Sequence, residues 1–247
     1  MKTFKTMFQT ELKLSLRGMD MLLFAVFMPL TVMALLGMVY GSRPAFDGAG
    51  YTFLEQSFGA LTTISICAGG VMGLPLVVSD YRDKKILKHF QVTPVSPMMI
   101  LSVQLTVYAL YSLASLILLY LAGAIFFGCQ LKGSVLLFTG SYLLVMLSMF
   151  SLGLMAGGIA PNPKAASVIA CILYFPMLIF SGATLPYEIM PAAFARAADV
   201  LPLTQGIKLL KAASLGLPVD KIIMPIILLL ALTVVCTGIS LKFFRWE

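Results

Sequence analysis

Charged residues are scarce in this sequence of 247 residues. Only 11% of the chain is charged, whereas 60% is hydrophobic, and the mean hydropathy is +0.99. A soluble globular domain needs far more polar surface than this composition provides. The sequence therefore predicts an all-α integral membrane protein, because helices satisfy their own backbone hydrogen bonds inside a bilayer.

Histidine and cysteine are too few and too dispersed for a metal or redox site. His89 is the sole histidine, and Cys67, Cys129, Cys171 and Cys236 stand singly in apolar sequence without a C-x-x-C pair. We expect these cysteines to be small packing residues, and we expect no metal site. An integral membrane enzyme would need clustered acids, histidines or a cysteine–histidine pair, so catalysis is the least favoured function.

Neither ATP nor nucleic acid is an expected ligand of this chain. The G-x-x-x-x-G-K-[ST] pattern of a phosphate-binding loop is absent, and the nearest sequence, Lys132-Gly133-Ser134, has the wrong order. The net charge of +7 would suggest nucleic acid in a soluble protein. Here the basic residues stand at the ends of apolar runs, where orientation in a membrane explains them.

Long apolar runs predict six membrane spans within one transmembrane domain of residues 1–247. Each run has about 20 residues or more, as a bilayer core requires. The expected spans are 21–40, 56–78, 98–128, 134–160, a fifth that begins at Ala165, and 222–241. Most lysines and arginines of the short loops lie on the side of the two termini. Both termini are therefore expected in the cytosol, and the protein in the inner or plasma membrane.

Residues 1–18 predict an amphipathic helix that lies in the cytosolic membrane interface. Its apolar side holds Phe4, Met7, Phe8, Leu12 and Leu14, and its polar side holds Lys2, Lys5, Gln9, Lys13 and Arg17. The lysines are expected to face phosphate headgroups. Glu11 falls inside the apolar stripe and needs a partner that the sequence does not identify.

Residues 79–97, SDYRDKKILKHFQVTPVSP, form a charged cluster between long uncharged runs. Asp80 is expected to cap a short helix that has Asp83 at its third position, and Thr93-Pro94 is expected to end it. Ile86, Leu87 and Phe90 give this helix an apolar side beside its lysines, which favours a surface that docks a partner. A solvated loop that only orients the protein is the alternative.

The segment after the fifth span is interrupted by prolines. Ser181-Gly182 ends the span, and Pro186, Pro191 and Pro202 separate two short helical pieces, one through Arg196 and Asp199 and one over 203–213. Helices this short cannot cross a bilayer, so residues 185–217 are predicted to re-enter the membrane from outside. An ordinary extracellular loop is the alternative. If the segment re-enters the membrane, Glu188 needs water or a basic partner there, for which Arg196 and Lys208 are candidates.

This order of parts resembles the permease subunit of type-2 ABC exporters, a family that includes drug, antibiotic and polysaccharide exporters. The resemblance covers the interfacial helix, the six spans, the basic loop after the second span and the broken helices after the fifth. The loop sequence from Asp80 to Ser96 and the prolines of the outer segment match the family pattern. Asp80 stands where glutamate is usual, and Lys85 stands where glycine is usual.

The resemblance implies that residues 80–90 are a coupling helix, seated on a separate ATP-hydrolysing subunit that holds ATP and magnesium. The residues implied in ATPase coupling are Asp80, Tyr81, Arg82, Lys84, Lys85, Ile86, Leu87, Phe90, Thr93 and Pro94. The segment 185–217 would close the exit, with an outer gate at Ser181, Gly182, Pro186, Glu188, Pro191 and Pro202. The expected assembly has two permeases, as a homodimer or heterodimer, and two ATPases, and its expected activity is multidrug export.

A secondary transporter or channel without an ATPase is the alternative function. Such a protein needs a titratable or ion-coordinating group near the middle of the membrane. The predicted spans contain no aspartate, glutamate, lysine, arginine or histidine. This absence argues against proton coupling and leaves backbone-coordinated sodium open.

Overall fold

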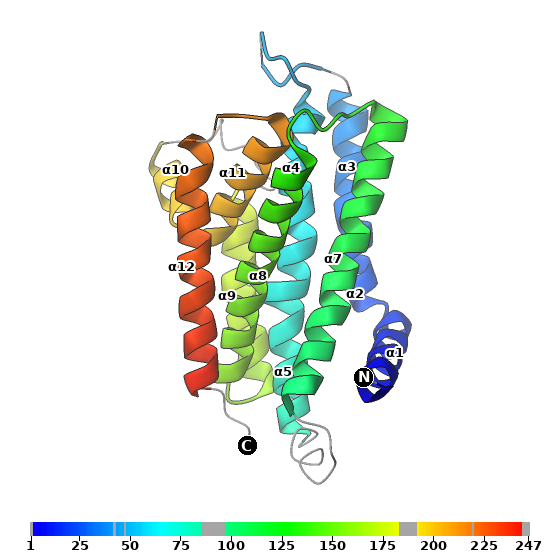
Figure 1. The fold of residues 1–247 in the computed structure, drawn as a ribbon, viewed down its shortest axis with the longest axis vertical. Helices are drawn as coiled ribbons and strands as arrows, with labels where there is room; N and C mark the ends of the chain where they lie inside the picture. Colours follow the sequence, from blue (N-terminus) through cyan, green and yellow to red (C-terminus); the bar gives the residue numbers. More distant parts are fainter. Residues whose placement is uncertain are drawn as a thin grey trace.

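The computed structural model describes residues 2–41, 43–46, 48–84, 97–182, 192–218 and 220–243. Within these ranges the regular elements are helices, and one isolated β-bridge joins Pro44 to Thr52. The long helices run side by side along one axis, and α1 lies across one end of the bundle (Figure 1). The chain is therefore a helical bundle with one helix placed beside its end.

Among the described residues, six helical segments are long and apolar enough to cross a membrane, which confirms the prediction of six spans. The first span joins three pieces, as does the second, and each later span is a single helix. The elements are α1 Lys2–Gly18, α2 Asp20–Leu22, η1 Leu23–Phe27, α3 Met28–Tyr40, α4 Phe53–Cys67, η2 Ala68–Gly73, α5 Leu74–Asp83, α7 Pro97–Phe127, α8 Val135–Ile159, α9 Pro163–Phe180, α10 Ala192–Asp199, α11 Pro202–Leu215 and α12 Asp220–Phe243.

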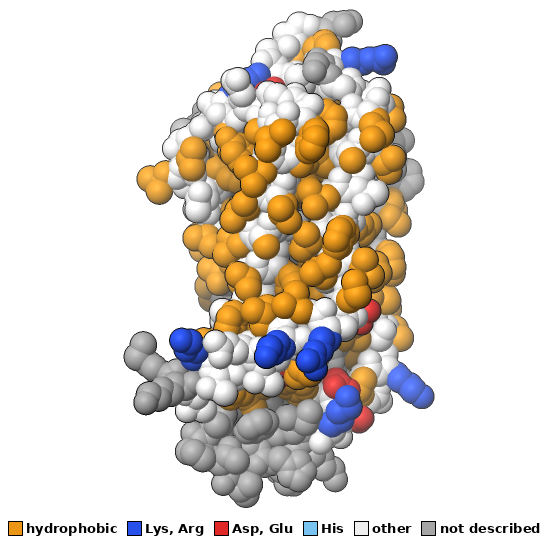
Figure 2. Space-filling view, turned by 90° about the vertical axis from the view of Figure 1, so that its right-hand side faces the viewer, with side chains coloured by type: hydrophobic (Ala, Val, Ile, Leu, Met, Phe, Trp, Pro, Cys, Tyr) orange, Lys and Arg blue, Asp and Glu red, His pale blue; other side chains and the backbone are white. Residues whose placement is uncertain are grey.

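The second span, built from α4, η2 and α5, is the axis of the bundle. It is buried over most of its length, whereas each of the other spans leaves a broad side exposed. Its neighbours are α3, α7, α8, α9 and α11. Exposed apolar side chains cover the outside of the bundle, and Figure 2 shows this apolar belt on one face. Lipid is the solvent that suits such a belt, since the belt would be far too apolar for water.

Glycines let α8 cross the second span at close range. A Cβ atom added to Gly153 would lie 1.8 Å from the carbonyl oxygen of Gly70, and one added to Gly157 would lie 2.9 Å from the Cα of Pro75. A Cβ added to Gly73 would lie 2.9 Å from the ring of Tyr108 on α7. These glycines of the second and fourth spans thus serve packing within one chain.

Two prolines inside spans each follow a π-helical stretch. Pro29 is near the start of α3, directly after η1, and Pro75 is near the start of α5, directly after η2. A proline ring clashes with the carbonyl four residues earlier and supplies no N–H. A wider π turn before the proline relieves both problems, so the span continues through it.

The second span extends further at both ends than the sequence predicts. Its C-terminal end is Asp83, not Val78, so Asp80 lies in the last turn of α5 and does not cap a separate helix. Capping preference is local, and no glycine or proline lies between Pro75 and Asp83 to stop the helix. At the outer end Glu55 is in the first turn of α4, where it forms a capping box with Thr52, and not in the preceding loop.

The interrupted outer segment contains the two short helices that the sequence predicts. The fifth span ends at Phe180, and Gly182 follows with a φ of 90°. Helix α11 is largely buried, and it contacts α4, α8, α9 and α12. It ends at Gly216, whose φ of 68° suits the left-handed conformation that glycine tolerates best. This short helix is therefore part of the core of the bundle.

Replacing Gly153 by alanine tests the close crossing of α8 and the second span. The added methyl group would collide with backbone, so we expect a loss of about 1–3 kcal/mol in the free energy of unfolding. Gly140 on the same helix is the control, because an added Cβ there meets nothing within 4 Å. The Gly140→Ala variant should be neutral or slightly stabilised. Thermal unfolding in detergent measures both, and equal melting temperatures would contradict this packing.

Candidate functional site

Arg82 ties the C-terminal end of the second span to the end of α8. Its side chain is only 8% exposed. Its guanidinium donates hydrogen bonds to the carbonyl oxygen of Gly158, at 3.2 Å, and to that of Ala160. Carbonyls at a helix C-terminus lack partners within the helix and carry partial negative charge, which a cation compensates. Arg82 is thus a buried cap for α8.

A second polar contact joins α1, α5 and α7 at the same end of the molecule. We call Glu11, Tyr81 and Gln104 the inner polar cluster. The amide nitrogen of Gln104 donates to a carboxylate oxygen of Glu11 at 2.8 Å and to the hydroxyl oxygen of Tyr81 at 2.8 Å. The Tyr81 hydroxyl is also hydrogen-bonded to Glu11. Gln104 is 5% exposed, so this cluster is the partner that Glu11 requires.

The residues implied in ATPase coupling divide into two groups. Tyr81 and Arg82 turn toward other helices of the bundle, whereas Lys84 forms an exposed ion pair with Asp80 at 2.8 Å. The basic side predicted for this stretch therefore does not include Arg82. The remaining residues of the set lie outside the described part of the chain: Lys85, Ile86, Leu87, Phe90, Thr93 and Pro94.

The described ends of this loop lie together at one end of the bundle. Helix α5 ends at Asp83 and α7 begins at Pro97, both near α1 (Figure 1). Arg82 fixes the first of these ends to α8, and the inner polar cluster fixes it to α7 and α1. A displacement of the loop would consequently be passed to three helices.

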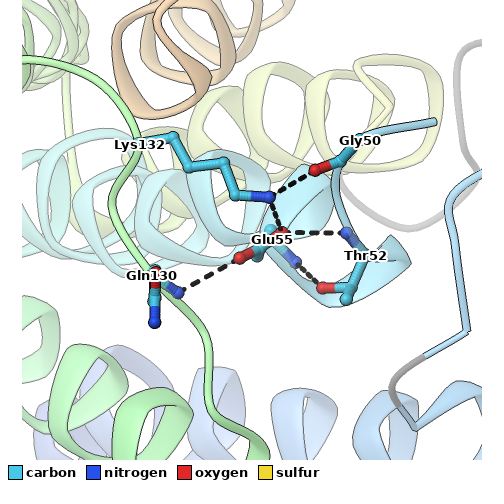
Figure 3. A network of polar contacts seen from close by, with 5 residues as sticks. All are labelled: Gly50, Thr52, Glu55, Gln130 and Lys132. Atoms are coloured by element: carbon cyan, nitrogen blue, oxygen red, sulfur yellow. Dashed lines mark hydrogen bonds and ion pairs between the residues drawn. The ribbon is translucent and has the colours of Figure 1, made fainter.

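At the opposite end of the second span, Glu55 is the centre of a buried polar network (Figure 3). Its carboxylate, in a side chain only 7% exposed, accepts from the backbone N–H of Thr52 at 2.8 Å and of Gln130 at 3.2 Å. The ammonium group of Lys132 lies 3.0 Å from the same carboxylate and 2.5 Å from the carbonyl oxygen of Gly50. A buried carboxylate is tolerated only with such complete pairing.

The turn between α7 and α8 extends this network to α11. The backbone N–H groups of Lys132 and Gly133 both donate to the carbonyl oxygen of Ser214, at 3.0 and 2.9 Å. A Cβ on Gly133 would lie 1.9 Å from the carbonyl oxygen of Ala213, so only glycine fits here. Nearby, burial raises the pKa of the Cys129 thiol, and the Glu55 carboxylate adds to this rise. Cys129 is accordingly a poor nucleophile at neutral pH.

Asp199 joins the two short outer helices. Its carboxylate lies 2.5 Å from the ammonium group of Lys208, and its carbonyl oxygen accepts from the side chain of Gln205 at 2.6 Å. The sequence suggests Lys208 as a partner for Glu188. In the structure Lys208 forms an ion pair with Asp199.

Of the proposed gate residues, Ser181 is buried at the end of α9, Gly182 follows it, and Pro202 starts α11. Pro186, Glu188 and Pro191 fall in a stretch that the structure does not describe.

Sequence reasoning missed Gln104 and the buried role of Arg82. A single amide in a long apolar run is a weak signal by itself, yet a polar side chain at that depth needs a partner. Glu11, the one acid in the apolar stripe of α1, was the matching signal. Pairing them requires knowledge that α1 lies against α7.

Comparison with known proteins agrees with this architecture, which is that of a polytopic membrane transport component. The sequence pattern of the ABC-2 type transporter family matches residues 2–215, so the chain belongs to this family. Membership makes it a membrane component of an ABC transporter and confirms the resemblance found in the sequence.

The chain is also similar to nodulation protein J of Rhizobium leguminosarum bv. viciae, with 33% identity over 76 residues. That match covers 31% of this chain and 29% of the other protein. The similarity therefore concerns less than a third of either protein.

Replacing Arg82 by methionine should destabilise the end of the bundle at which α5 and α8 end. The change keeps most of the side-chain volume and removes the donors to the end of α8, which should cost about 1–3 kcal/mol. Lys84→Met on the same helix is the control, since its exposed ion pair contributes at most about 0.5 kcal/mol. Chemical or thermal unfolding compares the two. An arginine variant as stable as the lysine variant would argue against the buried cap.

Replacing Glu11 by alanine should loosen α1. The amide of Gln104 and the hydroxyl of Tyr81 would lose their shared partner, so hydrogen exchange of the α1 amides should rise on the order of tenfold. The Glu11→Gln variant retains an acceptor and should show a smaller rise. Exchange mass spectrometry in detergent or nanodiscs measures the effect. Unchanged exchange in both variants would mean that the cluster does not hold α1.

Proposed function

We propose that this chain is the membrane-spanning subunit of an ATP-driven exporter, that it works as a dimer, and that separate ATPase subunits drive it through the loop between α5 and α7. Family membership and the lack of a phosphate-binding loop in the sequence support this proposal. The observation that carries it is the anchoring of the start of this loop. Tyr81 and Arg82 connect it to α1, α7 and α8, so force applied there reaches much of the bundle.

The second span is the proposed path of that force. Closure of the ATPase pair would displace the loop, and α5 would move with it. The close contacts of Gly153 and Gly157 with this span would carry the motion into α8. The π-helical stretch η2 lies between α4 and α5, at a place where helices commonly change direction. The inner half of the span could thus tilt while Glu55 holds the outer half.

Helices α10 and α11 are the proposed closure of the exit. A backbone that enters hydrocarbon must be shielded by protein, because each unpaired polar group there costs several kcal/mol. The burial of α11 among α4, α8 and α12 provides such shielding. The turn at 132–133 links α11 to the Glu55 network, so movement of the second span would reach the gate.

An apolar or amphipathic compound is the proposed cargo, in line with drug export. Among the described residues, Glu55 and Arg82 are the only buried charged side chains, and they lie at opposite ends of the second span. The buried polar residues between these levels are neutral. A strongly charged cargo would therefore meet no compensating charge along this part of the bundle.

Replacing Leu87 by aspartate should disrupt binding of the ATPase. An unpaired charge at a protein interface costs about 1–3 kcal/mol or more, so the amount of ATPase that co-purifies should fall roughly tenfold. Val200→Asp is the matched control, because Val200 is an exposed residue between α10 and α11. Quantitative co-purification and transport in vesicles measure the effect. Normal binding and normal export by the Leu87 variant would refute the proposed coupling.

A further inference from the structure

Helix α1 uses its apolar side within the protein. Met7 packs with Ile100 at the start of α7, and Phe8 and Leu12 pack against the main core. Glu11, the one acidic residue of α1, faces the same way and is held in the inner polar cluster. The apolar and acidic side chains of α1 are therefore largely directed toward the bundle.

The opposite side of α1 carries a stripe of exposed cations. Lys5, Lys13 and Arg17 are exposed, and Gln9 completes a repeat of four residues that keeps them on one side of the helix. None of the ion pairs found among the described residues includes these three side chains. We call Lys5, Lys13 and Arg17 the basic stripe.

The basic stripe is on a helix near the lower border of the apolar belt, which is the level expected for lipid headgroups. Helix α1 crosses the end of the bundle below the first span (Figure 1), and Figure 2 shows a row of lysine and arginine side chains along the lower border of the apolar belt on this face. Exposed Leu14, Leu16 and Met19 lie beside the stripe in the sequence and can contact acyl chains. Apolar contact next to unpaired cations suits a charged lipid better than a purely polar ligand.

We propose that the basic stripe of α1 is a binding site for the phosphate groups of anionic phospholipids in the cytosolic leaflet. Lysine and arginine bind phosphate oxygens through charge-assisted hydrogen bonds, and the spacing of the stripe allows more than one headgroup to bind. Through Glu11, a lipid held here is connected to Tyr81 and Gln104 at the base of the loop. This proposal does not depend on the proposed ATPase, since the purified chain alone should bind the lipid.

The test is lipid selectivity of the purified chain in phosphatidylcholine vesicles. Spin-labelled phosphatidylglycerol and spin-labelled phosphatidylcholine report the immobilised fraction at the protein surface. The unmodified protein should prefer phosphatidylglycerol, and added salt should weaken this preference. A triple variant, Lys5→Gln, Lys13→Gln and Arg17→Gln, should lose roughly tenfold in selectivity. Glutamine preserves helix propensity, so this variant should still fold.

Two controls separate this site from general positive charge. A triple variant that exchanges lysine and arginine at the same positions should keep the selectivity. Lys164→Gln, at the exposed start of α9, should change it little.

Equal selectivity in the unmodified protein and the glutamine variant would overturn the proposal, as would the absence of any preference for phosphatidylglycerol. If the glutamine variant instead loses a bound protein with its lipid selectivity intact, the stripe is a protein-docking surface and the proposal is wrong.

Discussion

Among the described residues, two buried charges constrain this protein, one at each end of its central span. Glu55 and Arg82 both lie out of water, and an uncompensated charge in such a place would cost several kcal/mol. Glu55 is paired by two backbone N–H groups and by Lys132, and Arg82 is paired by the carbonyl end of α8. Hydrogen bonds and ion pairs form only at short distances. The groups that pair with Glu55 and Arg82, including the end of α8, must therefore keep their positions. The two ends of the second span are thereby held in place.

Packing, and not charge, holds the middle of the same span. Gly153 and Gly157 let α8 approach its backbone, and Gly73 makes room for Tyr108 of α7. The wide turns of η2 and the following Pro75 interrupt the regular hydrogen-bond pattern at this level. Fixed ends and an irregular middle are what the proposed transmission of movement along this span requires.

The spans could be predicted from sequence because a bilayer imposes a length and a composition on each helix separately. The short outer helices were also predictable, since Pro202 and Gly216 act locally. The start of a new helix at Asp80 was wrong, because a capping preference has no effect where the preceding helix simply continues. The contact of Glu11 with Gln104 joins residues 93 positions apart, and no local pattern encodes such a distance.

Site-specific photo-crosslinking in native membranes tests the central claim most directly. A photoreactive amino acid would replace Lys84, which is exposed at the C-terminal end of α5, or Lys132, which lies at the opposite end of the bundle. The account predicts that position 84 crosslinks to a protein that contains a phosphate-binding loop and binds ATP, and that position 132 does not. Crosslinks to such a protein from both positions, or from neither, would contradict it.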